Sequence, residues 1–184
     1  MKMSIVLGIV LSVLSLTVGL GYAEAPHALE AENVEPSAHS TRGVMVIGPC
    51  TIQTIDGYYL TAVGGGGRIT DVIHTDATSI GSWEQFTLFH LGNRVYGLRT
   101  VNGNWLTAVD GGGRITDVLH SDAIHLQAWE EFTFHTTEDG YTAIATTTGH
   151  YLTAVGRGGR ITDTIHSDAT RIDDWEKFSI DCSH

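Results

Sequence analysis

The sequence predicts an all-β domain built from three copies of one short unit, and three observations support this. The stretch "YLTAVGGGGRITDVIHTDA" at 59–77 returns almost unchanged from Trp105 and from Tyr151, and the equivalent leucines Leu60, Leu106 and Leu152 follow one another at intervals of 46 residues. Short runs of β-branched and aromatic residues alternate with Gly, Asn and Asp, which is typical of strands and turns. No segment has the spacing of a long amphipathic helix.

Each copy has room for four short strands. In the first copy we expect them at 51–55, 59–63, 68–73 and 84–89, with one short helical turn within 76–83. Repeats of this length also form propellers, but a propeller takes at least four blades. About twelve short strands closed by pseudo-threefold symmetry predict a β-trefoil, with 46-residue repeats at about 44–91, 92–137 and 138–184.

The residues that are identical in all three copies include apolar residues, glycines and polar residues. Of the 27 columns from Leu60 to Phe86, 16 are identical in all three copies. The period and type of Leu60, Ala62, Ile69, Trp83 and Phe86, with their equivalents, predict the barrel core. We expect the paired glycines to adopt positive φ in tight turns, and they are Gly66, Gly67, Gly112, Gly113, Gly158 and Gly159.

The first 43 residues differ from the repeats. Lys2, an apolar run at 5–20 and the small residues Ala23 and Ala25 predict a secretory signal peptide at 1–25. An uncleaved membrane anchor is the alternative, although the run is shorter than the ~20 apolar residues that span a bilayer. Residues 26–43 have no aromatic residue and no apolar periodicity, which predicts a disordered linker or processed leader before the domain at 44–184. The mature chain is therefore expected to be secreted or periplasmic, without membrane insertion.

The two cysteines flank the repeats. Cys50 precedes the first repeat block and Cys182 follows the last one. In an oxidising compartment this placement predicts a disulfide, which would join the first strand to the last. Two free buried thiols are the alternative.

The charge of the chain excludes one class of partner. The formal net charge is −11, and only 17% of residues are charged. Phosphate backbones and anionic membrane surfaces attract Lys and Arg, so this chain is not expected to bind nucleic acid.

Four polar positions of the repeat are identical in every copy: Arg, Asp, His and Asp, beginning at Arg68, Asp71, His74 and Asp76. An aspartate acceptor, an imidazole and an arginine donor suit the hydroxyls of a sugar, and Tyr59 or its equivalents could cover the apolar face of the ring. The candidate ligand-binding residues are therefore Arg68, His74, Asp76, Arg114, His120, Asp122, Arg160, His166 and Asp168.

Other interpretations of these positions stay open. Asp76 could cap the turn at 77–80, with Arg68 paired to Asp71 or Asp76. The three histidines could instead form a metal site around the threefold axis, although no metal or other cofactor is expected. Tyr59, Trp105 and Tyr151 could equally be lids of the core.

Catalysis is not expected from this sequence. It contains no nucleophile elbow and no HExxH motif. Active sites are normally built once from unlike parts, whereas the polar residues here come in three equal sets. Three equal sites suit avidity instead.

Two family resemblances follow from the quoted motifs. The pattern aromatic-Leu-Thr-Ala, a Gly-rich turn and then Trp-Glu-x-Phe resembles the fascin-like β-trefoils over about 44–182, which implies the fold and an interaction role. Actin bundling is not expected from a single acidic trefoil with a signal peptide. The Gly-Gly turn followed by His-x-Asp resembles the mussel-type galactose-binding trefoil lectins. Their motif ends in a second histidine, where this chain has Thr78, Ile124 and Thr170.

The sequence thus predicts a secreted, non-enzymatic, lectin-like β-trefoil. Its expected partners are glycans or a glycosylated surface, bound weakly at up to three equivalent sites. The alternative is a fascin-like protein-interaction or inhibitor scaffold without a sugar site.

Overall fold

The computed structural model describes residues 43–182. The predicted signal peptide and nearly all of the predicted linker lie outside the described residues. Within the described part of the chain, no helix is both long enough and apolar enough to cross a lipid bilayer.

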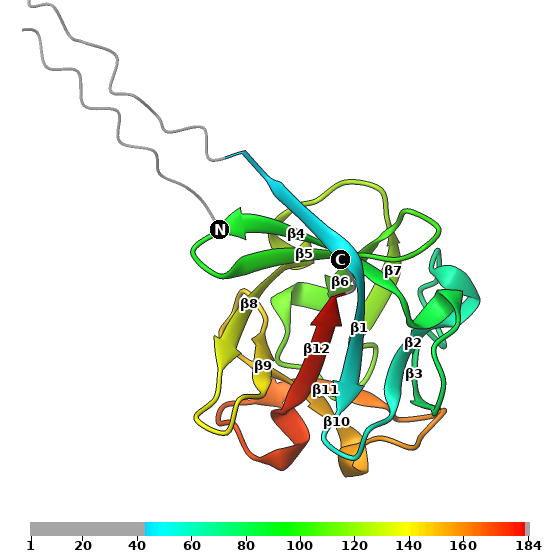
Figure 1. The fold of residues 1–184 in the computed structure, drawn as a ribbon, viewed down its shortest axis with the longest axis vertical. Coiled ribbons are helices and arrows are strands. Elements are labelled where there is room, and N and C mark those ends of the chain that lie inside the picture. Colours follow the sequence, from blue (N-terminus) through cyan, green and yellow to red (C-terminus); the bar gives the residue numbers. More distant parts are fainter. Residues whose placement is uncertain (1–42, 183–184) are drawn as a thin grey trace, which may run out of the picture. The chain divides into compact units, whose positions relative to one another are not determined.

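Twelve strands form the domain, four from each repeat (Figure 1). The first repeat supplies β1 (Met45–Thr54), β2 (Tyr59–Ala62), β3 (Ile73–Ala77) and β4 (Phe86–Gly92). The second supplies β5 (Val95–Arg99), β6 (Trp105–Ala108), β7 (Leu119–Ala123) and β8 (Glu131–Thr136). The third supplies β9 (Thr142–Ala145), β10 (Tyr151–Ala154), β11 (Ile165–Ala169) and β12 (Phe178–Cys182).

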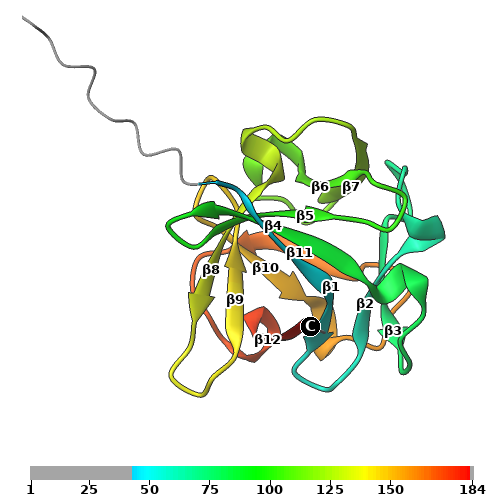
Figure 2. The ribbon, with the colours of Figure 1, turned by 45° about the horizontal axis from the view of Figure 1, so that its top comes forward.

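Six of these strands close a barrel. The antiparallel neighbours run β1–β4–β5–β8–β9–β12 and return to β1. The other six form three hairpins, β2–β3, β6–β7 and β10–β11, one from each repeat (Figure 2). A six-stranded barrel with three hairpins is the β-trefoil, so the predicted fold class is confirmed.

Short 3-10 turns complete each repeat at two equivalent places. One turn follows the second strand of the repeat, and the other precedes the fourth strand. They are η1 (Val63–Gly65) and η2 (Ser82–Glu84), η3 (Val109–Gly111) and η4 (Ala128–Glu130), and η5 (Val155–Arg157) and η6 (Asp174–Glu176).

The barrel interior is filled by equivalent side chains from the three repeats. Phe86, Phe132 and Phe178 are at most 1% exposed, and the leucines and alanines of the "LTA" strands are equally buried. Burying each large apolar side chain contributes about 1.5–3 kcal/mol. The core assignments of Leu60, Ala62 and Phe86 and their equivalents are confirmed.

Two of the predicted core positions are wrong. Ile69, Ile115 and Ile161 are 55–56% exposed, and Trp83, Trp129 and Trp175 are 44–48% exposed. The isoleucines leave the core because 68–72 is not a strand. Asp71 has a φ of 51°, outside the β region, so β3 begins only at Ile73.

The predicted disulfide is present. Cys50 on β1 and Cys182 on β12 are bonded and face each other in the antiparallel register. The bridge joins residues 132 apart in sequence and links the first strand to the last.

Candidate functional site

The Gly-Gly-Arg segment of each repeat is bonded to a strand of another repeat. The amide of Gly67 donates to the carbonyl of Ser121 at 2.6 Å, and the amide of Ser121 donates to the carbonyl of Arg68 at 2.8 Å. Ser121 itself is fully buried. The same pairs of bonds join 113–114 to Ser167 and 159–160 to Thr75. The three repeated stretches therefore form a closed ring of contacts.

Glycine is required at the first position of each pair. Gly66 has a φ of 102° and a ψ of −175°, a region that is essentially restricted to glycine. A Cβ at this position would overlap Thr100 Oγ1 and lie 2.9 Å from Thr100 Cβ. Gly112 faces Thr146 in the same way, and Gly158 faces Thr54. The expected positive φ at these glycines is confirmed.

The structure brings Arg68 and His74 together on Asp71. His74 Nε2 lies 2.6 Å from Asp71 Oδ1, and Arg68 Nη2 donates to Asp71 Oδ2 at 3.2 Å. Arg68 Nε also donates to the carbonyls of Thr70 and Asp71 at 3.2 and 3.1 Å. We call each such triad a polar cluster, and the three are Arg68–Asp71–His74, Arg114–Asp117–His120 and Arg160–Asp163–His166.

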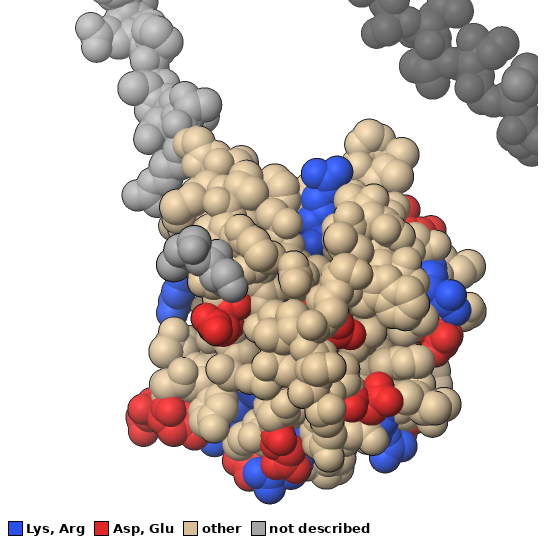
Figure 3. All heavy atoms as spheres, turned by 45° about the vertical axis from the view of Figure 1, so that its right-hand side comes forward, with Lys and Arg blue, Asp and Glu red and all other residues tan. Residues whose placement is uncertain are grey.

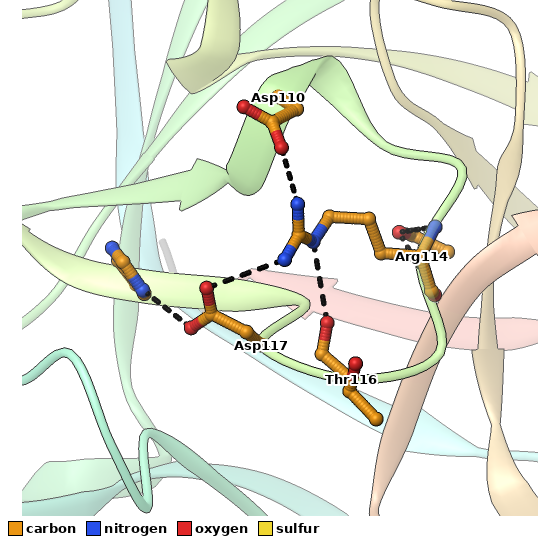
Figure 4. Close-up of polar contacts among 6 residues, drawn as sticks. Asp110, Arg114, Thr116 and Asp117 are labelled. Carbon is orange, nitrogen blue, oxygen red and sulfur yellow. Dashed lines mark hydrogen bonds and ion pairs between the residues drawn. The ribbon is translucent and has the colours of Figure 1, made fainter.

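The second polar cluster has an additional acidic partner. Asp110 takes the place of the glycines at 64 and 156, and its carboxylate pairs with Arg114. The guanidinium of Arg114 lies between Asp110 and Asp117, and its Nε donates to the carbonyl of Thr116 (Figure 4). This arginine is therefore held more firmly than its two equivalents.

Of the two aspartates considered as partners of Arg68, the structure pairs it with Asp71 and not with Asp76. Asp76 is exposed, and neither it nor Asp122 or Asp168 has a side-chain hydrogen bond to the neighbouring Arg or His. The histidine turns instead to Asp71, in the loop before its strand. Nor does Asp76 cap a helical turn at 77–80, because the nearest 3-10 turn begins at Ser82.

The three histidines do not form a metal site. Within residues 43–182, no group of three or more His, Cys, Asp or Glu side chains is placed to hold a metal ion. Each imidazole is bonded to the aspartate of its own repeat, with Nε2 to Oδ1 distances of 2.6–2.8 Å.

The aromatic residues at 59, 105 and 151 belong to the body of the domain. Trp105 is 9% exposed, its ring meets Phe89 edge-on at 4.8 Å, and Arg99 lies over it at 5.5 Å. Tyr151 is half-buried and meets His135 edge-on. Trp105 is therefore a lid of the core, not a platform for a sugar ring.

Each exposed tryptophan of the repeat faces solvent because the glutamate that follows it in the sequence is buried. Glu84 Oε1 accepts a bond from Thr61 Oγ1 and Oε2 accepts one from the amide of Gly81, both at 2.7 Å. This fixes the turn with the glutamate inside and the preceding tryptophan outside. Identical bonds hold Glu130 and Glu176. Sequence reasoning missed this, because the Trp-Glu pair does not show which of its two members faces the core.

Each exposed indole lies beside the glycine turn of its own repeat. The two 3-10 turns of a repeat pack together in all three copies. In the second copy, a Cβ on Gly111 would lie 3.6 Å from Cδ1 of Trp129, and the adjacent Asp110 pairs with Arg114. The exposed face therefore combines an indole, a glycine turn and one edge of a polar cluster. We call these faces the indole sites, and they are centred on Trp83, Trp129 and Trp175.

The third indole site differs from the others in charge. A shallow hollow of about 540 Å³ is lined by 172–177, around Trp175. Lys177 Nζ donates to Asp139 Oδ2 at 2.8 Å, and this hydrogen bond lowers the pKa of Asp139 and raises the pKa of Lys177. Arg157 adds a second cation, 3.0 Å from Asp56 Oδ1 and 3.9 Å from Asp174 Oδ2.

Charges of both signs are interspersed on the surface. On the face drawn in Figure 3, small groups of acidic and basic side chains are separated by uncharged ones. Such a face has no continuous basic stripe of the kind that tracks a phosphate backbone.

Comparison with known proteins supports the fold alone. No family model matches the sequence, and no curated protein matches it. A designed threefold-symmetric protein, ThreeFoil, is similar at a TM-score of 0.61 and 13% identity, over 71% of this chain and 96% of that one. A mosquitocidal holotoxin is similar at a TM-score of 0.59 and 6% identity, over 77% of this chain but only 17% of the toxin. Both similarities are to proteins of low sequence identity, so they show that the chain is a β-trefoil and assign no function.

Proposed function

We propose that this chain is an exported, non-catalytic carbohydrate-binding trefoil with up to three weak sites at equivalent positions. The observation that carries the proposal is the set of three half-exposed tryptophans, Trp83, Trp129 and Trp175, at equivalent positions of the surface. An indole has a flat apolar face that can cover the C–H face of a sugar ring, and its N–H can bond a hydroxyl.

The neighbouring polar groups suit the rest of a sugar. Arg68 uses Nε and Nη2 within its polar cluster, so further guanidinium donors remain for hydroxyl groups. The glycine turn lets a ligand approach the backbone closely. In this proposal the indole takes the place of Tyr59 and its equivalents as the platform, and Asp71 is the aspartate that contacts His74.

Three like sites on one small domain favour a multivalent ligand. Each site offers one ring face and few donors, so a single contact is weak, and linked contacts raise the apparent affinity by up to ~10²–10⁴-fold. A glycosylated surface presents such repeated ligands. The disulfide is compatible with an exported protein because these bonds persist in oxidising compartments.

A glycan array with residues 26–184 tests the proposal. We expect W83A, W129A and W175A to weaken binding to a multivalent glycan modestly as single changes, and by at least ~10²-fold when combined, because avidity multiplies weak sites. Val46→Ala with Ile124→Ala is the matched control, since both side chains are exposed and neither lies at a position equivalent to those that line the hollow around Trp175. Unchanged binding by the triple tryptophan variant would contradict the assignment.

The polar clusters are tested in the same assay. The triple variant H74A, H120A and H166A removes one partner of each aspartate and should weaken glycan binding if the clusters contact the sugar. Thermal unfolding of the same variants separates lost contacts from lost stability. If the parent chain binds no glycan and captures a defined protein, the domain is an interaction scaffold instead.

A further inference from the structure

A single pocket lies where the three repeats meet. It is lined by the same five positions from each copy, 69–73, 115–119 and 161–165, and its volume is about 600 Å³. Because each repeat contributes equally, the pseudo-threefold axis passes through it. It is distinct from the indole sites, whose tryptophans do not line it.

The walls of this axial pocket are mostly hydrocarbon. Ile69, Ile115 and Ile161 line it and are 55–56% exposed, whereas the apolar side chains at the next wall positions, 72–73 and 118–119, are buried. Three large isoleucines from distant parts of the sequence are thus exposed to one shared space. Exposed apolar groups gathered in a concave place mark binding sites more often than scattered ones do.

The charged groups that line the axial pocket are already paired. Asp71 has one carboxylate oxygen bonded to Arg68 and the other in contact with His74. The equivalent aspartates of the other two repeats are engaged in the same way. Thr164, which replaces a valine of the other copies, donates its hydroxyl to the carbonyl of Ile73 at 2.6 Å. The wall therefore offers a ligand little net charge.

We infer that the axial pocket binds one small, neutral, apolar molecule per chain. Its volume falls within the ~300–1,000 Å³ that is usual for small-molecule sites. A cation would compete with Arg68 and His74 for Asp71, and an anion would have to displace Asp71 from Arg68. A neutral apolar molecule covers the isoleucines without breaking either contact. The inference rests on the pocket alone and is independent of sugar binding.

Titration with N-phenyl-1-naphthylamine, a neutral apolar fluorophore, tests the inference on the domain with its disulfide intact. We expect a saturable rise in fluorescence with one molecule bound per chain. The double variant I69Q/I115Q should bind about tenfold more weakly or worse, because less apolar surface is buried. The matched control I80Q/I124Q changes two isoleucines that are also exposed but lie outside the pocket, and should bind within about twofold of the parent.

A filling variant separates pocket loss from unfolding. I115W keeps the wall apolar but occupies the space, so it should also lose the probe while its thermal unfolding stays close to that of the parent. Binding of three molecules per chain, an equal loss in the control, or no saturable signal would each overturn the inference. The tryptophan variants of the indole sites should leave this titration unchanged, so failure of one proposal does not imply failure of the other.

Discussion

Changing Gly66 to alanine should destabilise the domain more than the same change at a positive-φ glycine of the first repeat where a Cβ would meet no neighbouring atom. The backbone at Gly66 occupies a glycine-only region, which costs another residue about 1–3 kcal/mol. The new Cβ would also overlap Thr100 Oγ1, and such overpacking costs about 1–3 kcal/mol more. We therefore expect Gly66→Ala to lower the free energy of unfolding by about 2–6 kcal/mol.

Gly57 provides the control for the backbone effect. Its φ is 87°, but a Cβ there would meet nothing within 4 Å, so Gly57→Ala should cost only about 1–2 kcal/mol. Thr100→Ala removes the hydroxyl and methyl that face Gly66, so the double variant should recover about 1 kcal/mol or more of the summed losses. Urea unfolding of the parent and the four variants measures these values. Equal losses for Gly57→Ala and Gly66→Ala, with no coupling to Thr100, would refute the steric argument.

Three further predictions follow from individual contacts. Replacing Cys50 and Cys182 by serine should lower the unfolding free energy by up to ~4–5 kcal/mol, because the bridge closes a loop of more than 100 residues, and free thiols in the parent would contradict it. Glu84→Gln should cost about 1–3 kcal/mol in urea unfolding, since one of two buried hydrogen bonds loses its acceptor. Lys177 lowers the pKa of Asp139, so this pair stabilises the fold at neutral pH and the contribution is lost as pH falls through that lowered pKa. The melting temperature of Asp139→Asn should therefore fall less than that of the parent between pH 7 and acid pH, and an identical fall would contradict the pairing.

The fold was predictable because the repeat encodes it several times over. Three gapless copies fix the symmetry, and each copy shows β-branched runs between glycine and asparagine turns. The cysteines, which flank the identical stretches, follow the same logic, since barrel closure brings the first strand beside the last. These inferences need only spacing and composition, which a sequence displays directly.

The candidate site was less predictable because it depends on where the backbone leaves the strand. Asp71 has a positive φ, so the apparent strand "RITDVI" is a loop up to Val72, and Ile69 turns outward. Local alternation cannot reveal this, because aspartate tolerates both conformations. For the same reason the sequence left open whether Arg68 pairs with Asp71 or Asp76, whereas the structure places Asp71 between Arg68 and His74.

The closed ring of contacts between the repeats accounts for much of the sequence identity among the copies without any ligand. Each Gly-Gly-Arg segment is hydrogen-bonded to the strand of a different repeat, so a change in one copy alters a contact with another. Core packing accounts for the leucines and phenylalanines, and the buried acceptor role accounts for Glu84. Trp83 and its equivalents have no such explanation, because a half-exposed indole contributes little to the core. Tryptophan at that position in all three copies is therefore the feature on which we base the proposed carbohydrate sites.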